Sequence, residues 1–233
     1  SRTWTAPRPW IWNSAARRRG RLTYALIISV MAKAKASSQT APSPDGPQMY
    51  PDGFATTVRI DGQTNVLCGA HRPGHFDGVA TVVTKLFTQT SADLAFFGEK
   101  DFQQLQVVRR LALDLDLGVE VVGCPTIREI DGLAMSSRNL LLSDQARSRA
   151  AALNEVMEEM ATKQGQVSEM GSLLPEARSR LAAAGFGDID YLEMRTNDTL
   201  TLIERATEPA RLFAAAYMAG GRLIDNIDVP VAQ

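Results

Sequence analysis

The sequence predicts an α/β fold in which a parallel, doubly wound sheet is followed by a smaller α+β unit. Between residues 49 and 125, segments with the helical period of 3.6 residues alternate with short, continuous apolar runs. Such runs are typical of strands that are buried on both faces of a parallel sheet. Beyond residue 140 two helical segments precede three strand-like segments, which indicates a second unit of α+β type.

The elements of the first unit follow from local patterns. Residues 54–60 and 63–68 flank Asp61-Gly62, a turn signal, and are predicted to form a β-hairpin. His75 to Thr88 is predicted to be a helix. Its apolar stripe consists of Val79, Val82, Val83, Leu86 and Phe87. The elements predicted after it are a strand at 92–97, a helix at 101–115 and a strand at 119–122.

The second unit begins with a capped helix. Ser143-Asp144 is a helix-start signal before an apolar stripe that runs towards Lys163, and a second helix is predicted over 173–184. Residues 190–194, 211–218 and 222–226 are predicted to be three strands. The turns between them are expected at Asn197-Asp198 and Gly220-Gly221.

Charge is unevenly distributed along the chain. Eight Lys or Arg and no acidic residue precede Asp45, whereas 17 basic residues face 26 acidic ones from there on. The body is therefore acidic, and no nucleic-acid partner is expected for it. The apolar run at 22–32 is too short to span a bilayer, so no membrane partner is expected either.

The first 43 residues differ in composition from the rest and are predicted to be a separate basic leader. Arg17, Arg18, Arg19 and Arg21 precede the apolar run, which is the arrangement of a secretory signal. The segment nevertheless starts with Ser1 and is rich in Trp and Arg. We expect a disordered leader, an out-of-frame translation or an artefact of the coding sequence, in preference to a targeting signal.

The two cysteines, Cys68 and Cys124, each lie in an apolar run with no partner at metal-ligand spacing. Buried free thiols are favoured over a disulfide or a metal site. Free thiols fit a reducing compartment, and a cytoplasmic location is expected.

Two polar runs contain the residue types that suit phosphate binding. Gly98-Glu99-Lys100-Asp101 follows a predicted strand and opens a helix, where glycine, a lysine charge and free N–H groups suit a phosphate. Residue types alone leave a second interpretation open, because Asp101 and Gln104 have the spacing of a capping box that would only start the helix. Met135-Ser136-Ser137-Arg138 offers hydroxyl and guanidinium donors that also match phosphate oxygens.

These runs, taken with several others, resemble the pantothenate synthetase family, whose members join pantoate to β-alanine using ATP. The resemblance extends from about residue 41 to the C-terminus. The segments that carry it are 49–54, 67–70, 72–76, 98–105, 122–129, 132–139 and 222–226. It implies an incomplete Rossmann-like, nucleotidyltransferase-type domain at 44–127 and a C-terminal lid domain at 128–233.

The resemblance also implies a reaction and a set of roles. ATP and pantoate would form pantoyl adenylate and pyrophosphate, with Mg²⁺ on the phosphates, and β-alanine would then release AMP. Lys100 and Arg138 would stabilise developing charge, and Gln104 would bind pantoate. The ATP-binding residues would be Gly98, Glu99, Lys100, Asp101, Ile127, Met135, Ser136, Ser137 and Arg138. A homodimer is also implied.

The chain departs from the family pattern near its start. The family's histidine motif, Met-x-x-Leu-His-x-Gly-His, does not appear in residues 1–40, and the only two histidines are His71 and His75. Their spacing includes one residue too many, and Pro73 interrupts the turn that the motif requires. A structural or substrate-gating role is favoured for them over replacement of the catalytic histidine, and metal binding is less favoured still because no third ligand is evident.

Two functions of different classes follow. The first is an AMP-forming carbon–nitrogen ligase. This polypeptide is expected to have little of that activity by itself. The second is a non-catalytic remnant that binds nucleotide or pairs with an intact subunit.

Overall fold

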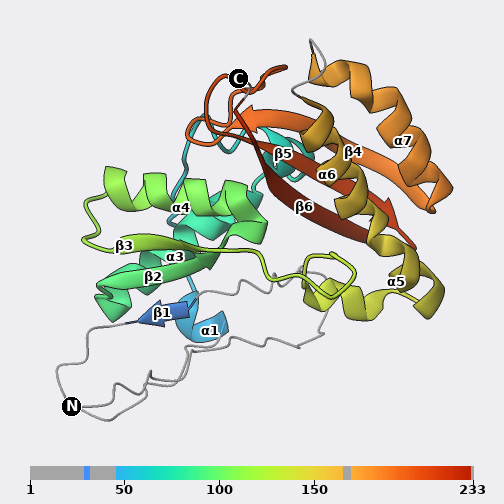
Figure 1. Cartoon of the computed structure of the whole chain (residues 1–233). Helices are drawn as coiled ribbons and strands as arrows, with labels where there is room; N and C mark the ends of the chain where they lie inside the picture. The colour runs from blue at the N-terminus through green and yellow to red at the C-terminus, as the bar shows by residue number, and fades with distance from the viewer. Residues whose placement is uncertain (1–28, 32–45, 165–168, 232–233) are drawn as a thin grey trace, which may run out of the picture.

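The computed structural model describes residues 29–31, 46–164 and 169–231 of the 233-residue chain. They form two three-stranded sheets, each with helices packed against it (Figure 1). The first lies in the α/β half and the second in the C-terminal half. The α/β expectation is therefore confirmed, with a small parallel element and an antiparallel C-terminal sheet.

The first sheet has the order β1-β2-β3, formed by β1 (Ser29–Met31), β2 (Leu94–Gly98) and β3 (Glu120–Cys124). β2 and β3 are parallel, and their register pairs Gly98 with Cys124. β1 is antiparallel to β2 and lies within the segment 1–43 that was expected to be a leader. The rest of that segment, apart from β1, is outside the described residues.

Helices α3 (His75–Thr90) and α4 (Phe102–Asp114) share a hydrophobic core with this sheet. The 3-10 helix η1 (Glu99–Asp101) joins β2 to α4. The helices and strands predicted between residues 75 and 122 are confirmed, with ends that move by a few residues. Short helices α1 (Gly46–Met49) and α2 (Leu67–His71) precede them.

The predicted hairpin at 54–68 is wrong. Residues 54–61 form no helix or strand, and the chain then enters α2. Buried side chains, and not a neighbouring strand, form hydrogen bonds with backbone groups of the segment 58–68. Gln103 donates to the carbonyl oxygens of Gln63 and Val66 and accepts from the Cys68 N–H, while Thr81 Oγ1 accepts from the Val58 N–H.

The C-terminal sheet is an antiparallel meander of β4 (Phe186–Thr196), β5 (Ala210–Met218) and β6 (Gly221–Val229). This confirms the three predicted strands. The predicted helix from residue 143 is broken at Ala151 into α5 (Asp144–Ala150) and α6 (Ala152–Lys163). Ser143 caps α5 as expected, because its Oγ accepts from the Ala146 N–H at 3.3 Å.

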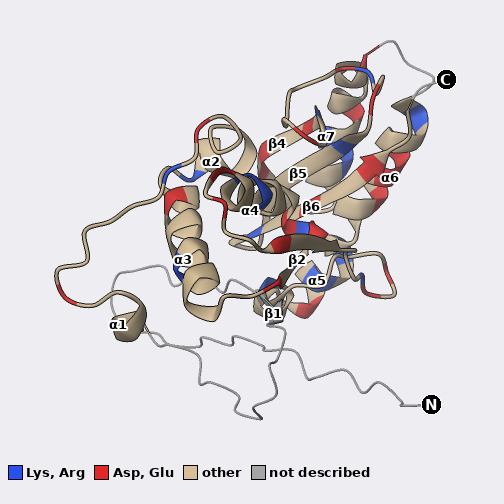
Figure 2. Ribbon diagram, turned by 90° about the vertical axis from the view of Figure 1, so that its left-hand side faces the viewer, with Lys and Arg blue, Asp and Glu red and all other residues tan. Residues whose placement is uncertain are grey.

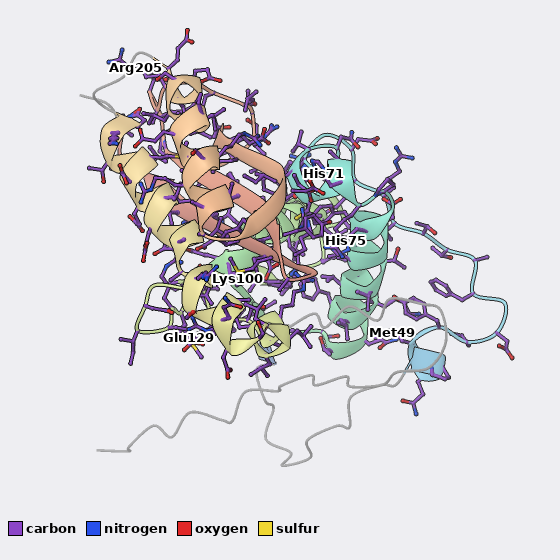
Figure 3. The ribbon with its side chains drawn as sticks, turned by 90° about the vertical axis from the view of Figure 1, so that its right-hand side faces the viewer. Met49, His71, His75, Lys100, Glu129 and Arg205 are labelled. Atoms are coloured by element: carbon purple, nitrogen blue, oxygen red, sulfur yellow. The ribbon has the colours of Figure 1, made fainter. Side chains whose placement is uncertain are left out.

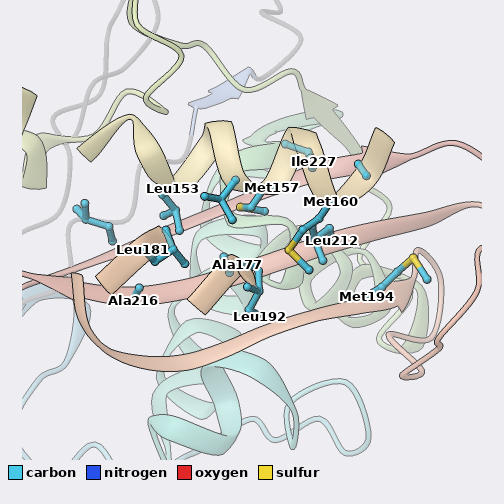
Figure 4. Packing of buried hydrophobic residues seen from close by; sticks show 14 of the residues in the cluster. Leu153, Met157, Met160, Ala177, Leu181, Leu192, Met194, Leu212, Ala216 and Ile227 are labelled. Atoms are coloured by element: carbon cyan, nitrogen blue, oxygen red, sulfur yellow. The ribbon is translucent and has the colours of Figure 1, made fainter. Parts of the chain in front are cut away.

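Helix α7 (Leu174–Ala183) follows the 3-10 helix η4 (Met170–Leu173) and covers the sheet together with α6. Figure 4 shows the apolar side chains between these helices and the strands. Met157, Leu181 and Leu212 have essentially no exposed surface. This core accounts for the apolar stripe of the predicted helix at 143–163.

The C-terminal sheet is a middle layer, because β5 contributes side chains to two cores. Leu212, Ala214 and Ala216 belong to the core under α6 and α7. Phe213 and Ala215, which alternate with them, belong to the core of the α/β half. The region predicted as the lid domain at 128–233 therefore also contributes side chains to the core of the region at 44–127. Within the described helices, none is long and apolar enough to cross a membrane.

Candidate functional site

Residues from both predicted runs line one narrow pocket. Lys100, Ser136 and Arg138 form part of its wall, together with Arg222 and Asp225 from β6. Figure 3 shows Lys100 next to the C-terminal sheet. Three cations thus surround a space in which Asp225, already paired with Arg128, is the acidic residue. The charges of the pocket favour an anion.

Gly98 lies at the junction of β2 and η1. It ends β2, and its φ of −67° and ψ of 132° are accessible to any residue. A Cβ at this position would meet no atom within 4 Å. Neither backbone conformation nor packing therefore requires a glycine, and the bare backbone leaves room for a ligand.

Asn226 holds Glu99 and Lys100 through their backbone carbonyl groups. The carbonyl oxygens of both accept hydrogen bonds from Asn226 Nδ2, at 2.8 and 2.9 Å. The Glu99 carboxylate accepts from Arg211 Nη2 at 3.1 Å. The side chain of Glu99 is thus engaged with β5, whereas within the described residues no hydrogen bond or ion pair involves Lys100 Nζ.

Asp101 and Gln104 do not form the capping box that was left open. Asp101 is the N-cap of α4, but its side chain makes no capping hydrogen bond, and it is exposed. Gln104 is half-buried in the first turn of α4. The alternative that these two residues serve only to start the helix is therefore wrong.

The second run leads into the 3-10 helix η2 (Ser137–Leu141). Ser136 caps it, since its Oγ accepts from the Arg138 N–H at 3.3 Å. The Met135 N–H donates to the Ile127 carbonyl oxygen at 2.9 Å, so Ile127 lies beside the run. The side chains of Met135 and Ile127 are exposed, at 50% and 71%.

His75 lies closer to this site than its sequence context indicated. It begins α3, and Figure 3 shows its position there. Burial lowers the pKa of His75 from 6.5 to about 4, with further contributions from neighbouring charges. Those charges are Arg72, Asp101, Arg138 and Arg222, of which Asp101 acts in the opposite direction. His75 is thus a neutral imidazole at neutral pH among the cations of the pocket.

His71 belongs to a neighbouring cluster. Its Nδ1 lies 3.5 Å from Asp190 Oδ1, and Arg222 Nε donates to Asp190 Oδ2 at 2.7 Å. Arg222 Nη1 also contacts Cys68 Sγ at 3.3 Å. Figure 2 shows how basic and acidic residues are distributed over the ribbon. The cluster holds Arg222 in place at the pocket wall.

The structure also places the cysteines. Cys68 is buried, with its Sγ 3.1 Å from Tyr191 Oη, while Cys124 is half-buried at the end of β3. Both are free thiols, as predicted. The described residues contain no group of three His, Cys, Asp or Glu side chains that could hold a metal ion.

Sequence reasoning missed the residues of β5 and β6 that reach the site: Arg211, Arg222, Asp225 and Asn226. All four are mostly buried and polar, which is uncommon unless the groups are paired. Charged and amide residues within predicted strands were the feature of the sequence that could have identified them.

The chain is similar to known proteins along most of its length. The family described as Pantoate-beta-alanine ligase matches residues 29–228. The chain is 66% identical over 191 residues to the pantothenate synthetase of Roseobacter denitrificans, covering 82% of this chain and 67% of that protein. It is 51% identical over 207 residues to that of Cereibacter sphaeroides, covering 89% and 74%. The matches span about two thirds to three quarters of these relatives.

Solved structures show the same likeness. The pantothenate synthetase of Thermus thermophilus superposes with a TM-score of 0.75 at 45% identity, over 80% of this chain and 68% of that one. The pantoate-β-alanine ligase of Francisella tularensis, solved with β,γ-ATP and β-alanine, gives 0.61 at 30% identity, over 78% and 61%.

The fold and these relatives define the class as an ATP-using carbon–nitrogen ligase. Within that class, the chain belongs to the pantoate-β-alanine ligase family, the pantothenate synthetases.

Proposed function

We propose that this protein condenses pantoate with β-alanine at the expense of ATP, through a pantoyl adenylate, with release of pyrophosphate and AMP. The observation that carries the proposal is the convergence of Lys100, Ser136 and Arg138 on one pocket. These residues come from two runs that are separated by more than thirty positions in the sequence. Their common location is what an ATP site divided between two loops requires.

The adenylation step needs positive charge where negative charge develops. Lys100 supplies a compact ammonium group and Arg138 a planar guanidinium, which suit the α-phosphate and the leaving pyrophosphate. Gly98 leaves room for a phosphate next to the backbone, and the first N–H groups of the 13-residue helix α4 lie just beyond it. Positioning and charge stabilisation would thus account for the contribution of these residues.

Gln104 is the candidate pantoate ligand. It lies half-buried in the first turn of α4, next to the phosphate-binding loop. Its amide provides both a donor and an acceptor for a hydroxy acid. Within the described residues no hydrogen bond uses this side chain, whereas its neighbour Gln103 is fully engaged with the chain at 63–68.

Mg²⁺ would accompany the triphosphate. Magnesium sites of this kind use one or two carboxylates, phosphate oxygens and water. Asp101, next to Lys100 at the start of α4, is exposed, and the described residues contain no group of three metal-ligating side chains. The residues therefore fit an ion brought by ATP. A homodimer and a cytoplasmic location belong to the same proposal and rest on the family alone.

A second candidate function is nucleotide binding without ligation. The observation that favours it is that Lys100, Ser136 and Arg138 offer charge and hydrogen bonds to phosphate oxygens, which suffice for binding without a reaction. The neutral His75 beside Asp101 and Arg138 makes it the residue to examine if ligation does occur.

One experiment separates the two. AMP is measured after incubation of the full chain with ATP, Mg²⁺, pantoate and β-alanine, with each substrate omitted in turn. AMP that requires both substrates and is lost in Lys100→Ala supports the ligase. ATP binding without AMP supports the second candidate, and the absence of both overturns the nucleotide site.

A further inference from the structure

The side-chain amide of Asn226 ties the first phosphate-binding run to β6. Nδ2 donates to the carbonyl oxygens of Glu99 and Lys100 at 2.8 and 2.9 Å, so both of its hydrogens are used. Oδ1 accepts from Arg211 Nη1 at 2.8 Å, which fixes the orientation of the amide. Asn226 is 2% exposed, and water therefore does not compete for these bonds.

The preceding residue, Asp225, ties the second run to the same strand. Its carboxylate accepts from Arg128 Nη1 at 2.7 Å and Nη2 at 3.1 Å, a bidentate pair. Arg128 Nη1 also donates to the Gly132 carbonyl oxygen at 3.0 Å. Arg128 and Ala134 form a β-bridge immediately before the run at 135–138. Asp225 therefore anchors the turn from which that run emerges.

Neighbouring strand residues point to opposite faces of a sheet. Asn226 is on the face of β6 that meets Glu99 and Arg211, and Asp225 is on the face that meets Arg128. Consecutive Cα atoms are about 3.8 Å apart. The two runs are therefore fastened to opposite sides of one short, rigid piece of strand.

We propose that Asp225 and Asn226 are the positioning residues of this site, which set the separation between Lys100 and Arg138. Asn226 acts through the loop backbone and Asp225 acts through Arg128. This inference rests on the proposed function, since it states how the site of that reaction is assembled. Neither residue is required to touch substrate.

A ligand-free measurement tests the positioning itself. Hydrogen–deuterium exchange is followed in the full chain and in the near-isosteric variants Asn226→Asp and Asp225→Asn. Asn226→Asp removes both donors and should speed exchange at residues 99–104, while Asp225→Asn should do so at 128–138. Exchange unchanged in both segments, or raised equally across the whole chain, would overturn the assignment.

ATP binding then links positioning to function. By calorimetry, each variant should bind ATP about tenfold more weakly than the wild-type chain, which corresponds to loss of one well-placed interaction. Asp228→Asn is the matched control, since Asp228 is on the same strand, contacts Arg211 and is 72% exposed. It should bind ATP within about twofold of wild type.

Double variants distinguish positioning from a general loss of structure. If Asn226 acts through Lys100, Asn226→Asp should add less than about twofold to Lys100→Ala but keep its full effect in Arg138→Ala. Asp225→Asn should show the opposite pattern. Equal, additive losses in both backgrounds would overturn the proposal. Absence of ATP binding in the wild type would instead overturn the proposed function, with the exchange data still deciding the positioning.

Discussion

Arg211, on β5, stacks on Phe102 at the start of α4, with Cζ 4.2 Å from the ring centre. The same guanidinium contacts Glu99 and Asp228, and its side chain is 9% exposed. One residue of the C-terminal half therefore supports both the phosphate-binding loop and the helix that follows it.

Arg211→Met should lower the free energy of unfolding by about 3 kcal/mol, because it leaves the Glu99 carboxylate without its partner in a mostly buried place. Urea unfolding monitored by circular dichroism measures the change. Asp228→Asn is the control and should cost less than about 1 kcal/mol, since Asp228 is largely exposed. Equal losses in the two variants would mean that the Glu99 contact contributes nothing.

Gly98→Ala should separate folding from binding. The new methyl group meets no atom, and φ is negative, so the free energy of unfolding should change by less than about 1 kcal/mol. ATP affinity should nevertheless fall, because the methyl group occupies the approach path of a phosphate. Calorimetry on the folded variant measures it, and unchanged affinity would exclude a close phosphate approach at Gly98.

Gly132→Ala provides the contrasting variant. Gly132 has a φ of +89°, and a Cβ there would lie 2.7 Å from Asn154 Oδ1. We expect a loss of about 1–2 kcal/mol in the free energy of unfolding from the backbone alone. A neutral effect in urea unfolding would show that this turn can change its conformation.

His75 should make stability depend on pH. Its pKa is about 4 in the folded chain and near 6.5 when unfolded. The unfolded chain therefore binds the proton more readily between these values. The contribution of His75 is complete above about pH 6.5, declines as pH falls towards 4 and is absent below that. With partial solvent exposure taken into account, we expect about 1–2 kcal/mol.

The variant His75→Gln isolates this contribution. The difference in unfolding free energy between wild type and variant should shrink between pH 7 and pH 4.5 in urea titrations. The neighbouring charges Arg72, Asp101, Arg138 and Arg222 remain in both proteins. A difference that is independent of pH would contradict the lowered pKa.

Lys100→Ala and Arg138→Ala should each weaken ATP binding by tenfold or more, which is about 1.4 kcal/mol or above. Their removal also decreases the salt dependence of binding, because fewer cations face the phosphates. Arg110→Ala is the charge-matched control, since Arg110 lies on α4 in an exposed pair with Asp114. Binding that is lost equally in Arg110→Ala would point to general electrostatics and not to this pocket.

Local pattern was sufficient for most of the regular structure. The apolar residues of α3, β2, α4 and β3 show which side of each element is buried, and their spacing follows the period of a helix or a strand. The three strands after residue 186 were predictable for the same reason, and the Ser143 cap because its hydroxyl can accept from a free N–H of the first turn. The hairpin at 54–68 was not, because Gln103, some 40 residues away, satisfies the backbone there.

The sequence by itself therefore determined most of the helices and strands, the family resemblance and the two runs at 98–101 and 135–138. Only the tertiary structure decided that these runs meet, since β6 brings Asp225 and Asn226 against residues that lie 97 to 127 positions earlier. It likewise decided that His75 is neutral, through burial and the cations around it. Such contacts join distant positions, and the period of a local pattern contains no information about them.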